Sequence, residues 1–409
     1  MNNNNELQTI TTVSTIGEIE DSNGIVVTEM PNLYEWVPIG KGSYQYGNGS
    51  PEIKVEPIAF EGIFDGQEYT INGLYMDKRN HEYSQSFIAY NKGVVKNVVI
   101  DNSFIIAASQ RISFIVSENH GLVYNCVNKG NLVNFGDNFS HNAGMIGDNE
   151  GVIRQCSNYG NIFASAGCSG ICGRSLANSM IDSCSNYGIV EACATTFSPR
   201  ASGIVIQIAK GGTVVNCFNM GNTKSAGIVG PSSAGQVINC FNAGTIATTS
   251  CYTVGGIVAQ GTENIKNCYN IGKIINTNGT YTGRIIGYNV ISGGLGANIE
   301  NCYNLGTVTS SKYYVGEIAG RFQLGNQNCH VYNYYNIDNK YFGGVDSTVV
   351  KTNPGTIDSS QKLTPGITIN GETYTTLLSA LNAWVDANKS TYPELKNWVK
   401  GKDGYPVLQ

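Results

Sequence analysis

Residues 264 to 272 read NIKNCYNIG, and this phrase returns along most of the chain in the form apolar-x-[NQS]-Cys-x-Asn-x-Gly. Successive copies stand 23 to 34 residues apart and place a cysteine at Cys126, Cys156, Cys184, Cys217, Cys240, Cys268 and Cys302. Val98 and Tyr334 take the cysteine position at the two ends. They lie 236 residues and eight steps apart, so the mean period is 236/8 = 29.5 residues. A period of roughly 20–50 residues indicates a solenoid, a propeller or a helical array.

A second phrase lies between the copies of the first and reads NAGMIG, CSGICG, ASGIVI, SAGIVG, VGGIVA, TGRIIG and VGEIAG. Each repeat therefore holds two short apolar β segments joined by Gly and Asn turns, which excludes helical arrays. Propeller blades need about 40 residues each, and the uneven steps do not suit them. The sequence predicts an all-β fold: a parallel, right-handed β-helix of about nine or more coils with capped ends and one short C-terminal α-helix.

Stacking at about 4.8 Å per coil aligns equivalent residues in columns. We expect the cysteines to point inward as reduced thiols, provided that the residue before each cysteine lies in a bend that resets the alternation of the strand. Parallel Cβ vectors disfavour disulfides along such a column. A second column should join its amides from coil to coil and allow positive φ: Asn128, Asn158, Asn186, Asn219, Asn242, Asn270, Asn304 and Asn336.

Opposite charges occur at equivalent positions of neighbouring coils, in the pairs Arg154 with Asp182, Lys266 with Glu300, and Arg284 with Glu317. Like charges in one column would repel each other, so we interpret these pairs as devices that fix the register of an exposed ladder.

The phrase NCYNxGxV, with GGIVAQ-type segments between its copies, resembles the repeats of the GLUG family, which occur in bacterial surface and secreted proteins. FEGIFDGQEYTINGLYM at 60–76 is similar to the segment that precedes the repeats in that family. The similarity covers residues 93–345 and departs from the family pattern at Val98 and Tyr334. It implies a β-solenoid at the cell surface, and it implies no reaction and no catalytic residues.

Four segments follow from these patterns. Residues 1–30 are a polar lead-in or tether, 31–92 an N-terminal cap with the first coils, 93–345 the repeats, and 346–409 a linker, a helix and a hairpin. Leu377, Leu381, Trp384 and Val385 have helical spacing, and WVKGKDGYPVL predicts a hairpin. We expect this end to plug the last coil; the alternative is a small separate binding module.

Composition limits the partners. The net charge is −5 and no basic run occurs, so nucleic acid has no electrostatic footprint on this chain. No run of about 18 apolar residues exists, which predicts no membrane insertion. The first residues contain no secretory signal, yet the polar surface built from Asn, Ser and Thr with little Lys favours an extracellular or cell-surface location.

Catalytic and metal-binding patterns are weak. Asp148 and Glu150 stand close together beside a turn, and His120 and His141 could meet across a coil, but neither pair forms a known motif. His81 and His330 are isolated, and Cys168 with Cys172 should fall on two parts of one coil. We therefore predict no catalytic residue, no metal site and no cofactor.

The position after each cysteine carries the one pattern that suggests binding. If the cysteines point inward, an outward aromatic stripe follows, made of Phe218, Phe241, Tyr269, Tyr303 and Tyr335. Exposed aromatic rings stack on sugars or anchor protein partners, whereas a covered stripe would only stabilise the sheet.

The leading hypothesis is a non-enzymatic bacterial protein, displayed on the surface or secreted, that acts in adhesion through glycans or host cell-surface proteins or serves as a rigid spacer. The alternatives are a carbohydrate-active β-helix enzyme, either a polysaccharide lyase or a glycoside hydrolase, and a component of a phage or appendage fibre. The sequence does not define the oligomeric state.

Overall fold

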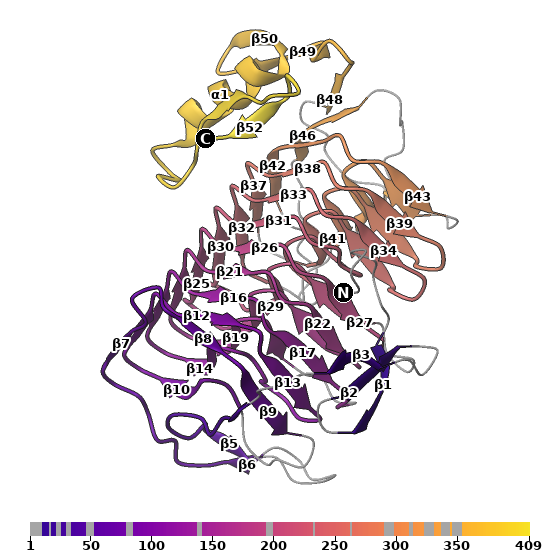
Figure 1. Cartoon of the computed structure of the whole chain (residues 1–409). Coiled ribbons are helices and arrows are strands. Elements are labelled where there is room, and N and C mark those ends of the chain that lie inside the picture. The colour runs from indigo at the N-terminus through magenta and orange to yellow at the C-terminus, as the bar shows by residue number, and fades with distance from the viewer. Residues whose placement is uncertain are drawn as a thin grey trace.

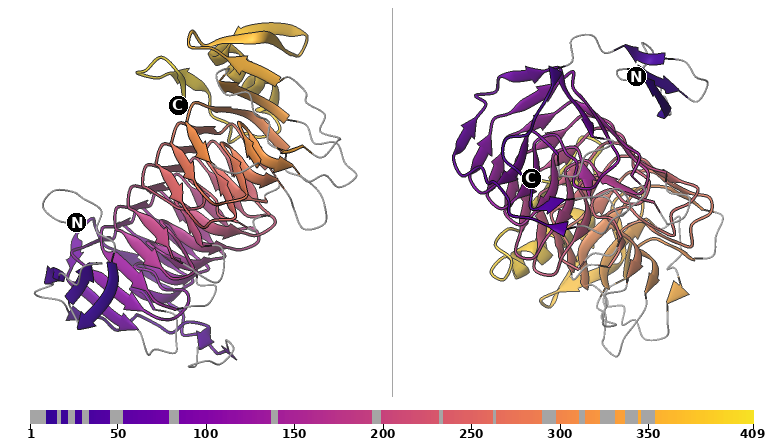
Figure 2. Two further views of the ribbon diagram at one scale, coloured as in Figure 1. Left: turned by 90° about the vertical axis from the view of Figure 1, so that its right-hand side faces the viewer. Right: turned by 90° about the horizontal axis from the view of Figure 1, so that it is seen from below.

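Short parallel strands stack coil on coil along one long axis in the computed structural model of the chain (Figures 1 and 2). The stack is a parallel β-solenoid, which confirms the predicted fold class. The structure describes residues 10–15, 18–21, 26–29, 34–45, 53–78, 85–136, 141–193, 199–231, 234–261, 264–289, 298–310, 314–322, 331–336, 344–345 and 354–409.

One long sheet holds the cysteine phrases, and each coil adds two short strands on either side of a bend. The registers run without a gap through equivalent residues, for example Val237, Ile265 and Ile299. The coil strands of this sheet are β7 (Ile63–Asp65), β8 (Thr70–Asn72), β11 (Val94–Lys96), β12 (Val99–Asp101), β15 (Leu122–Tyr124), β16 (Val127–Asn128), β20 (Val152–Arg154), β21 (Ser157–Asn158), β25 (Met180–Asp182), β26 (Ser185–Asn186), β30 (Thr213–Val215), β31 (Phe218–Asn219), β32 (Gln236–Ile238), β33 (Phe241–Asn242), β37 (Asn264–Lys266), β38 (Tyr269–Asn270), β42 (Asn298–Asn304) and β46 (Val331–Asn336).

The bend before each cysteine is a column of left-handed residues with φ between 51° and 57°: Asn97, Asn125, Gln155, Ser183, Asn216, Asn239, Asn267 and Asn301. A left-handed residue between two strands resets the alternation of side chains, so the cysteines turn inward as expected. All seven repeat cysteines are fully buried free thiols in the core. The prediction that the Asn128 column takes positive φ is wrong, because the residue before the cysteine makes the turn.

The Asn128 column forms the predicted amide ladder. From Asn128 to Asn304, each side-chain Nδ2 donates a 2.8 Å hydrogen bond to Oδ1 of the next coil. The last step differs because the pairing of β42 with β46 skips Asn301. Tyr335 rather than Asn336 therefore pairs with Asn304, and Asn333 rather than Tyr334 pairs with Cys302.

The second phrase builds a sharp corner between two narrower sheets. One sheet holds β18 (Asn142–Ala143), β23 (Gly167–Ser169) and β28 (Arg200–Ser202), and a later one holds β35 (Thr253–Gly255), β40 (Tyr281–Gly283) and β44 (Tyr314–Gly316). Across the corner lie β10 (Ile88–Asn91), β14 (Val116–Asn119), β19 (Ile146–Asn149), β24 (Cys172–Ser175) and β29 (Val205–Ile208), followed by β36 (Val258–Gln260), β41 (Ile286–Asn289), β45 (Ala319–Phe322) and β47 (Gly344–Val345). Cys168 and Cys172 lie on opposite sides of this corner as predicted, and both are buried free thiols.

A further face closes each coil. Its strands are β4 (Tyr34–Glu35), β9 (Leu74–Lys78), β13 (Phe104–Ala107), β17 (Asn131–Asn134), β22 (Ile162–Ala164) and β27 (Val190–Ala192), then β34 (Ile246–Thr248), β39 (Ile274–Asn276) and β43 (Val308–Ser310). Near the N-terminus, β1 (Ile10–Thr15), β2 (Glu18–Asp21) and β3 (Val26–Glu29) pair antiparallel, as do β5 (Tyr44–Gln45) and β6 (Ile53–Lys54). Ile, Val and Cys side chains fill the interior of the coils.

The predicted charge pairs are present. Arg154 Nε lies 2.9 Å from Asp182 Oδ2, Arg284 Nη1 lies 2.8 Å from Glu317 Oε2, and Lys266 pairs with Glu300. Only the first pair lies at the surface; Lys266, Arg284 and Glu317 are buried, so the expected exposed ladder is wrong for two of the three pairs. Lys266 lies under the ring of Tyr392. Arg284 and Glu317 occupy the inward column that holds glycine in earlier coils, where Asn304 contacts Glu317.

The C-terminal segment contains β48 (Pro354–Ile357), β49 (Lys362–Ile369), β50 (Glu372–Thr376), α1 (Leu377–Asn388), β51 (Trp398–Lys400) and β52 (Pro406–Leu408). The helix buries the four residues that its spacing singled out, and β51 and β52 form the predicted hairpin. Figures 1 and 2 show this yellow segment at the end of the stack opposite to β7. It also packs on the outer face of the long sheet, where Trp398 Nε1 donates a 2.6 Å hydrogen bond to Asn267 Oδ1. Within the described residues, no helix has the length and apolar character that crossing a membrane would require.

Candidate functional site

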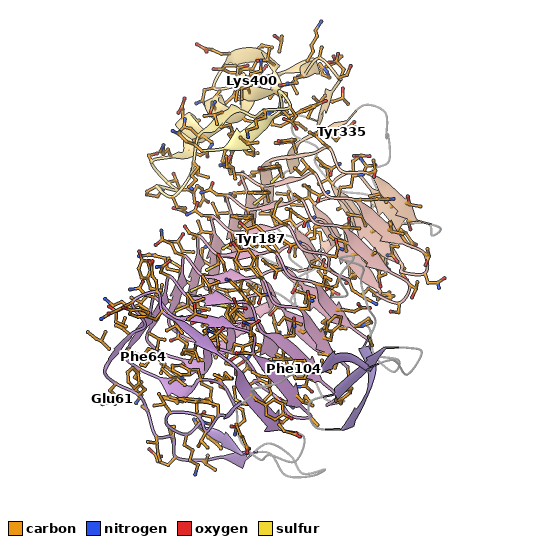
Figure 3. All side chains as sticks on the ribbon, viewed as in Figure 1. Glu61, Phe64, Phe104, Tyr187, Tyr335 and Lys400 are labelled. Carbon is orange, nitrogen blue, oxygen red and sulfur yellow. The ribbon has the colours of Figure 1, made fainter. Side chains whose placement is uncertain are left out.

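The aromatic stripe exists as a column but has a different last member. Phe218, Phe241, Tyr269 and Tyr303 stack with ring centroids 4.9–5.2 Å apart and ring planes within 12° of parallel. Tyr334 continues this register, because it pairs with Tyr303. Tyr335 instead packs against the interior core of the coils, so its predicted place in the stripe is wrong. Figure 3 labels Tyr335 near the last coil.

The upper part of the column is covered. Tyr269 and Tyr303 keep only 3% and 1% of their surface exposed. The ring of Trp398 lies 5.5 Å from each of them, and the hydroxyl of Tyr303 donates to the carbonyl of Pro406. The expected exterior surface is therefore absent at these two residues, because the C-terminal segment occupies it.

The exposed part of this face carries two tyrosines whose rings stack on each other. Tyr159 and Tyr187, which are 48% and 40% exposed, stack 4.5 Å apart with planes 4° from parallel. Figure 3 labels Tyr187 midway along the stack. The stack covers one face of each ring, and Phe218 also lies against Tyr187 with ring centroids 5.7 Å apart, which reduces the ring surface on which a sugar could stack. The stack is therefore a poor sugar platform.

Chemically diverse side chains gather instead along the corner of the second phrase. In each coil, one residue three positions before the corner and one residue four positions after it face each other; in the coil whose corner residue is Gly144, these are His141 and Asp148. Each of the two positions repeats along the stack, and we call the two resulting rows of residues the corner columns. The first column is Arg111, His141, Gly167, Arg200, Lys224, Thr253, Tyr281 and Tyr314. The second column is Tyr90, Glu118, Asp148, Arg174 and Gln207, followed by Gln260, Tyr288 and Arg321. Aligning the second phrase with its flanks would have revealed both columns from the sequence.

Asp148 is the centre of the charged end of the corner columns. Its Oδ2 lies 2.5 Å from Arg111 Nε and 2.6 Å from Arg174 Nη2, and its Oδ1 lies 3.1 Å from His141 Nδ1. Burial alone would raise the pKa of Asp148, but the hydrogen bond from His141 and the charges of His141, Arg111 and Arg174 hold it well below the ordinary value. Two guanidinium groups contact Oδ2, while Oδ1 faces the His141 ring.

Glu118 occupies the equivalent position one coil earlier and ties an N-terminal segment to the solenoid. The backbone N–H of Ser43 donates a 2.9 Å hydrogen bond to Glu118 Oε1, and the Ser43 hydroxyl donates to Oε2. Burial raises the pKa of Glu118 although both hydrogen bonds oppose the shift. The N-terminal segment consequently forms one wall over the column.

Between this wall and the columns lies a cleft of about 330 Å³. Its lining includes Lys54, Tyr90, Glu118, His120, Glu150 and Arg174. His120 Nδ1 lies 3.2 Å from Glu150 Oε2, and the His120 ring stacks on Tyr90 at 4.6 Å.

The structure thus brings together Asp148, Glu150, His120 and His141, which the sequence analysis treated as weak separate signals. The coil period places them on neighbouring turns. Among the residues that the structure describes, no three His, Cys, Asp or Glu side chains are arranged to hold a metal ion. His81 and His330 lie outside the described residues. The arrangement suits the binding of a polar ligand through Arg174, Lys54, His120 and Tyr90.

The fold and the site define a β-solenoid with a lateral polar cleft. No family model matches the sequence, and no curated protein matches it. A crystal structure from Bacteroides ovatus, named as a "putative immunoglobulin A1 protease", is similar over 86% of this chain and 78% of its own, at 18% identity and a TM-score of 0.32. A likeness at this TM-score carries no argument about the present chain.

Proposed function

We propose that this chain is a non-enzymatic, extracellular bacterial binding protein whose ligand is an extended glycan that lies along the corner columns. The observation that carries the proposal is the variation of these columns. Cys, Asn and Gly repeat in the other phrase of most coils, whereas the corner positions vary and include acidic, basic, amide and aromatic residues. The resemblance to GLUG repeats supports the surface location.

The dimensions suit a linear polymer. From the coil of Asp148 to the coil of Arg321 there are six steps, through the coils of Arg174, Gln207, Pro231, Gln260 and Tyr288. At about 4.8 Å per step the columns span about 29 Å. A chain of several sugar units could contact the cleft at one end and the tyrosines at the other.

The state of the acids favours binding over catalysis. Asp148 is held by Arg111, Arg174 and His141, and Glu118 by Ser43, so neither carboxylate is presented to a ligand as a free base. The charged groups that line the cleft are suited to hydrogen bonds with hydroxyl or carboxylate groups of a saccharide.

A glycoside hydrolase is the second candidate, because Glu118 and Asp148 are two acids with opposite pKa shifts in one cleft. Environments that separate the pKa values of two carboxyl groups are typical of acid–base pairs in glycosidases. The two candidates differ in one measurable outcome, the appearance of shortened glycan products.

A glycan array followed by titration of the best oligosaccharide tests the proposal. The double variant Lys54→Ala/His120→Ala should bind at least about tenfold more weakly, since the loss of a single hydrogen bond to a charged group already costs about 1.5 kcal/mol. Lys362→Ala, an exposed lysine in β49, is the matched control and should bind like the wild type. Chromatography of the incubated oligosaccharide should show no products. Products would favour the hydrolase, and equal binding by the double variant would remove the cleft from the ligand site.

A further inference from the structure

The opposite end of the corner columns is chemically different from the charged cleft. Tyr281 and Tyr314 occupy the first column there, and Tyr288 and Arg321 occupy the second. Tyr252, one residue before β35, lies against Tyr281 with ring centroids 5.2 Å apart. We call these five residues the tyrosine cluster.

Arg321 fixes the rings of the cluster. Its guanidinium carbon lies 5.5 Å from the ring centre of Tyr281 and 5.7 Å from those of Tyr288 and Tyr314. Its Nη1 donates a 2.7 Å hydrogen bond to the hydroxyl of Tyr281. Cation–π contacts within about 6 Å are attractive, so the arginine holds several tyrosines in a fixed arrangement.

Tyr281 and Tyr288 stack with ring centroids 4.7 Å apart, whereas the two exposed rings of the cluster, Tyr252 and Tyr314, do not join a parallel stack. Tyr252 is 50% exposed and its ring plane is 89° from that of Tyr281. Tyr314 is 36% exposed and tilted by 48° from Tyr281. Tyr159 and Tyr187 are exposed to a similar degree but lie 4° from parallel and cover each other. Ring orientation, rather than exposure, separates the two groups.

We propose that the tyrosine cluster is a subsite for neutral sugar units, which stack on the exposed rings of Tyr252 and Tyr314 two coils apart. The inference rests on the proposed glycan-binding function and adds the chemical class of the unit that binds at this end. Sugar rings present an apolar C–H face that packs on an aromatic face. The guanidinium of Arg321 contacts the tyrosine rings and the Tyr281 hydroxyl. Because these contacts use its positive charge, we expect a neutral sugar rather than an acidic one.

The test compares two double variants of the full chain, Tyr252→Ala/Tyr314→Ala and the matched control Tyr159→Ala/Tyr187→Ala. Each removes two half-exposed tyrosines from the side of the solenoid. Cellohexaose serves as the neutral probe and hexagalacturonic acid as the acidic probe in isothermal titration calorimetry. Thermal melts of all three proteins verify that the fold is kept.

The cluster variant should bind cellohexaose about threefold to tenfold more weakly, the range that aromatic stacking contributes, while the control variant should equal the wild type. Equal loss in both variants, or unchanged binding in the cluster variant, would overturn the subsite. Binding of hexagalacturonic acid alone would also overturn it, yet would keep the proposed function if Lys54→Ala/His120→Ala abolishes that binding. Absence of binding to both probes and to the glycan array would contradict the subsite and the function together.

Discussion

Each coil of the solenoid turns twice at a repeated phrase, and the two turns use their residues in opposite ways. At the cysteine bend, the same residues recur and contact their own copies: Asn242 bonds Asn270, and Gly272 lies under Asn242. At the glycine corner the turn itself recurs, but the flanking residues change from acid to base to aromatic. Residues that stack on their own copies are constrained by the fold, whereas residues that vary at equivalent positions are not held by contacts with identical neighbours.

The largest expected effect concerns a glycine at the constrained bend. An added Cβ at Gly160 would lie 1.8 Å from the carbonyl oxygen of Gly130 in the neighbouring coil. Because that oxygen belongs to backbone, neither partner can yield, and Gly160→Ala should cost about 5 kcal/mol or more of stability. Denaturant unfolding measures the loss. Gly62→Ala, whose Cβ would meet only the Phe60 ring at 3.5 Å, is the control and should be close to neutral.

The covered aromatic column provides the next largest effect. Tyr303 is 1% exposed and stacks on Tyr269 under the C-terminal hairpin. Tyr303→Ala should destabilise the protein by about 4 kcal/mol, as truncation of large core aromatics does, and should release the segment from the long sheet. Hydrogen exchange in α1 and β51 measures the release. Tyr303→Phe removes only the hydroxyl that bonds Pro406 and should cost about 1 kcal/mol.

The cysteine bend could be predicted in detail from the sequence because each residue meets its own copy one coil away. Aligning the repeats therefore identifies which residues are neighbours in adjacent coils. The thiol column, the amide ladder and the pair of Arg284 with Glu317 all follow from this alignment. The cover on Tyr269 and Tyr303 could not be predicted, because Trp398 contacts Asn267 across 131 residues with no repeat to link them. The corner columns were visible in principle, but a search for shared residues overlooks positions at which the residues differ.

A variant at Asp148 would show whether the charged end of the corner columns also stabilises the fold. The carboxylate pairs with Arg111 and Arg174 while nearly buried, so Asp148→Asn should cost about 3 kcal/mol at neutral pH, as loss of one partner of a buried ion pair does. Its pKa lies below the ordinary value of 3.8, so the unfolded chain binds the proton more readily. The contribution of the ionised Asp148 to the free energy of unfolding is therefore complete above about pH 4 and is lost as the pH falls below the ordinary pKa of 3.8.

Thermal unfolding at several pH values measures this difference. The gap between the wild type and Asp148→Asn should be widest near pH 7 and should narrow below about pH 4. A gap that stays constant with pH would mean that shape rather than charge makes Asp148 necessary. In that case the corner would be as constrained as the cysteine bend at this coil, and the comparison of the two turns would hold only for the later coils.

The smallest expected effect separates the two turns within a single coil. Gln260 lies in the second corner column, half-buried, between β36 and β41, where the next coils carry Tyr288 and Arg321. Asn270 lies in the amide ladder of the same coil and is fully buried, accepting from Asn242 and donating to Asn304. Asn270→Ala removes the hydrogen bonds that it accepts from Asn242 and donates to Asn304, and should cost about 2 kcal/mol, whereas Gln260→Ala should change stability by less than about 0.5 kcal/mol. Melting curves of the two variants compare their stabilities, and titration with cellohexaose compares their binding. Gln260→Ala should weaken binding while it leaves the melting temperature unchanged.

If Gln260→Ala destabilises the protein as much as Asn270→Ala does, the variation at the corner reflects local packing in each coil. The corner columns would then not be a ligand surface.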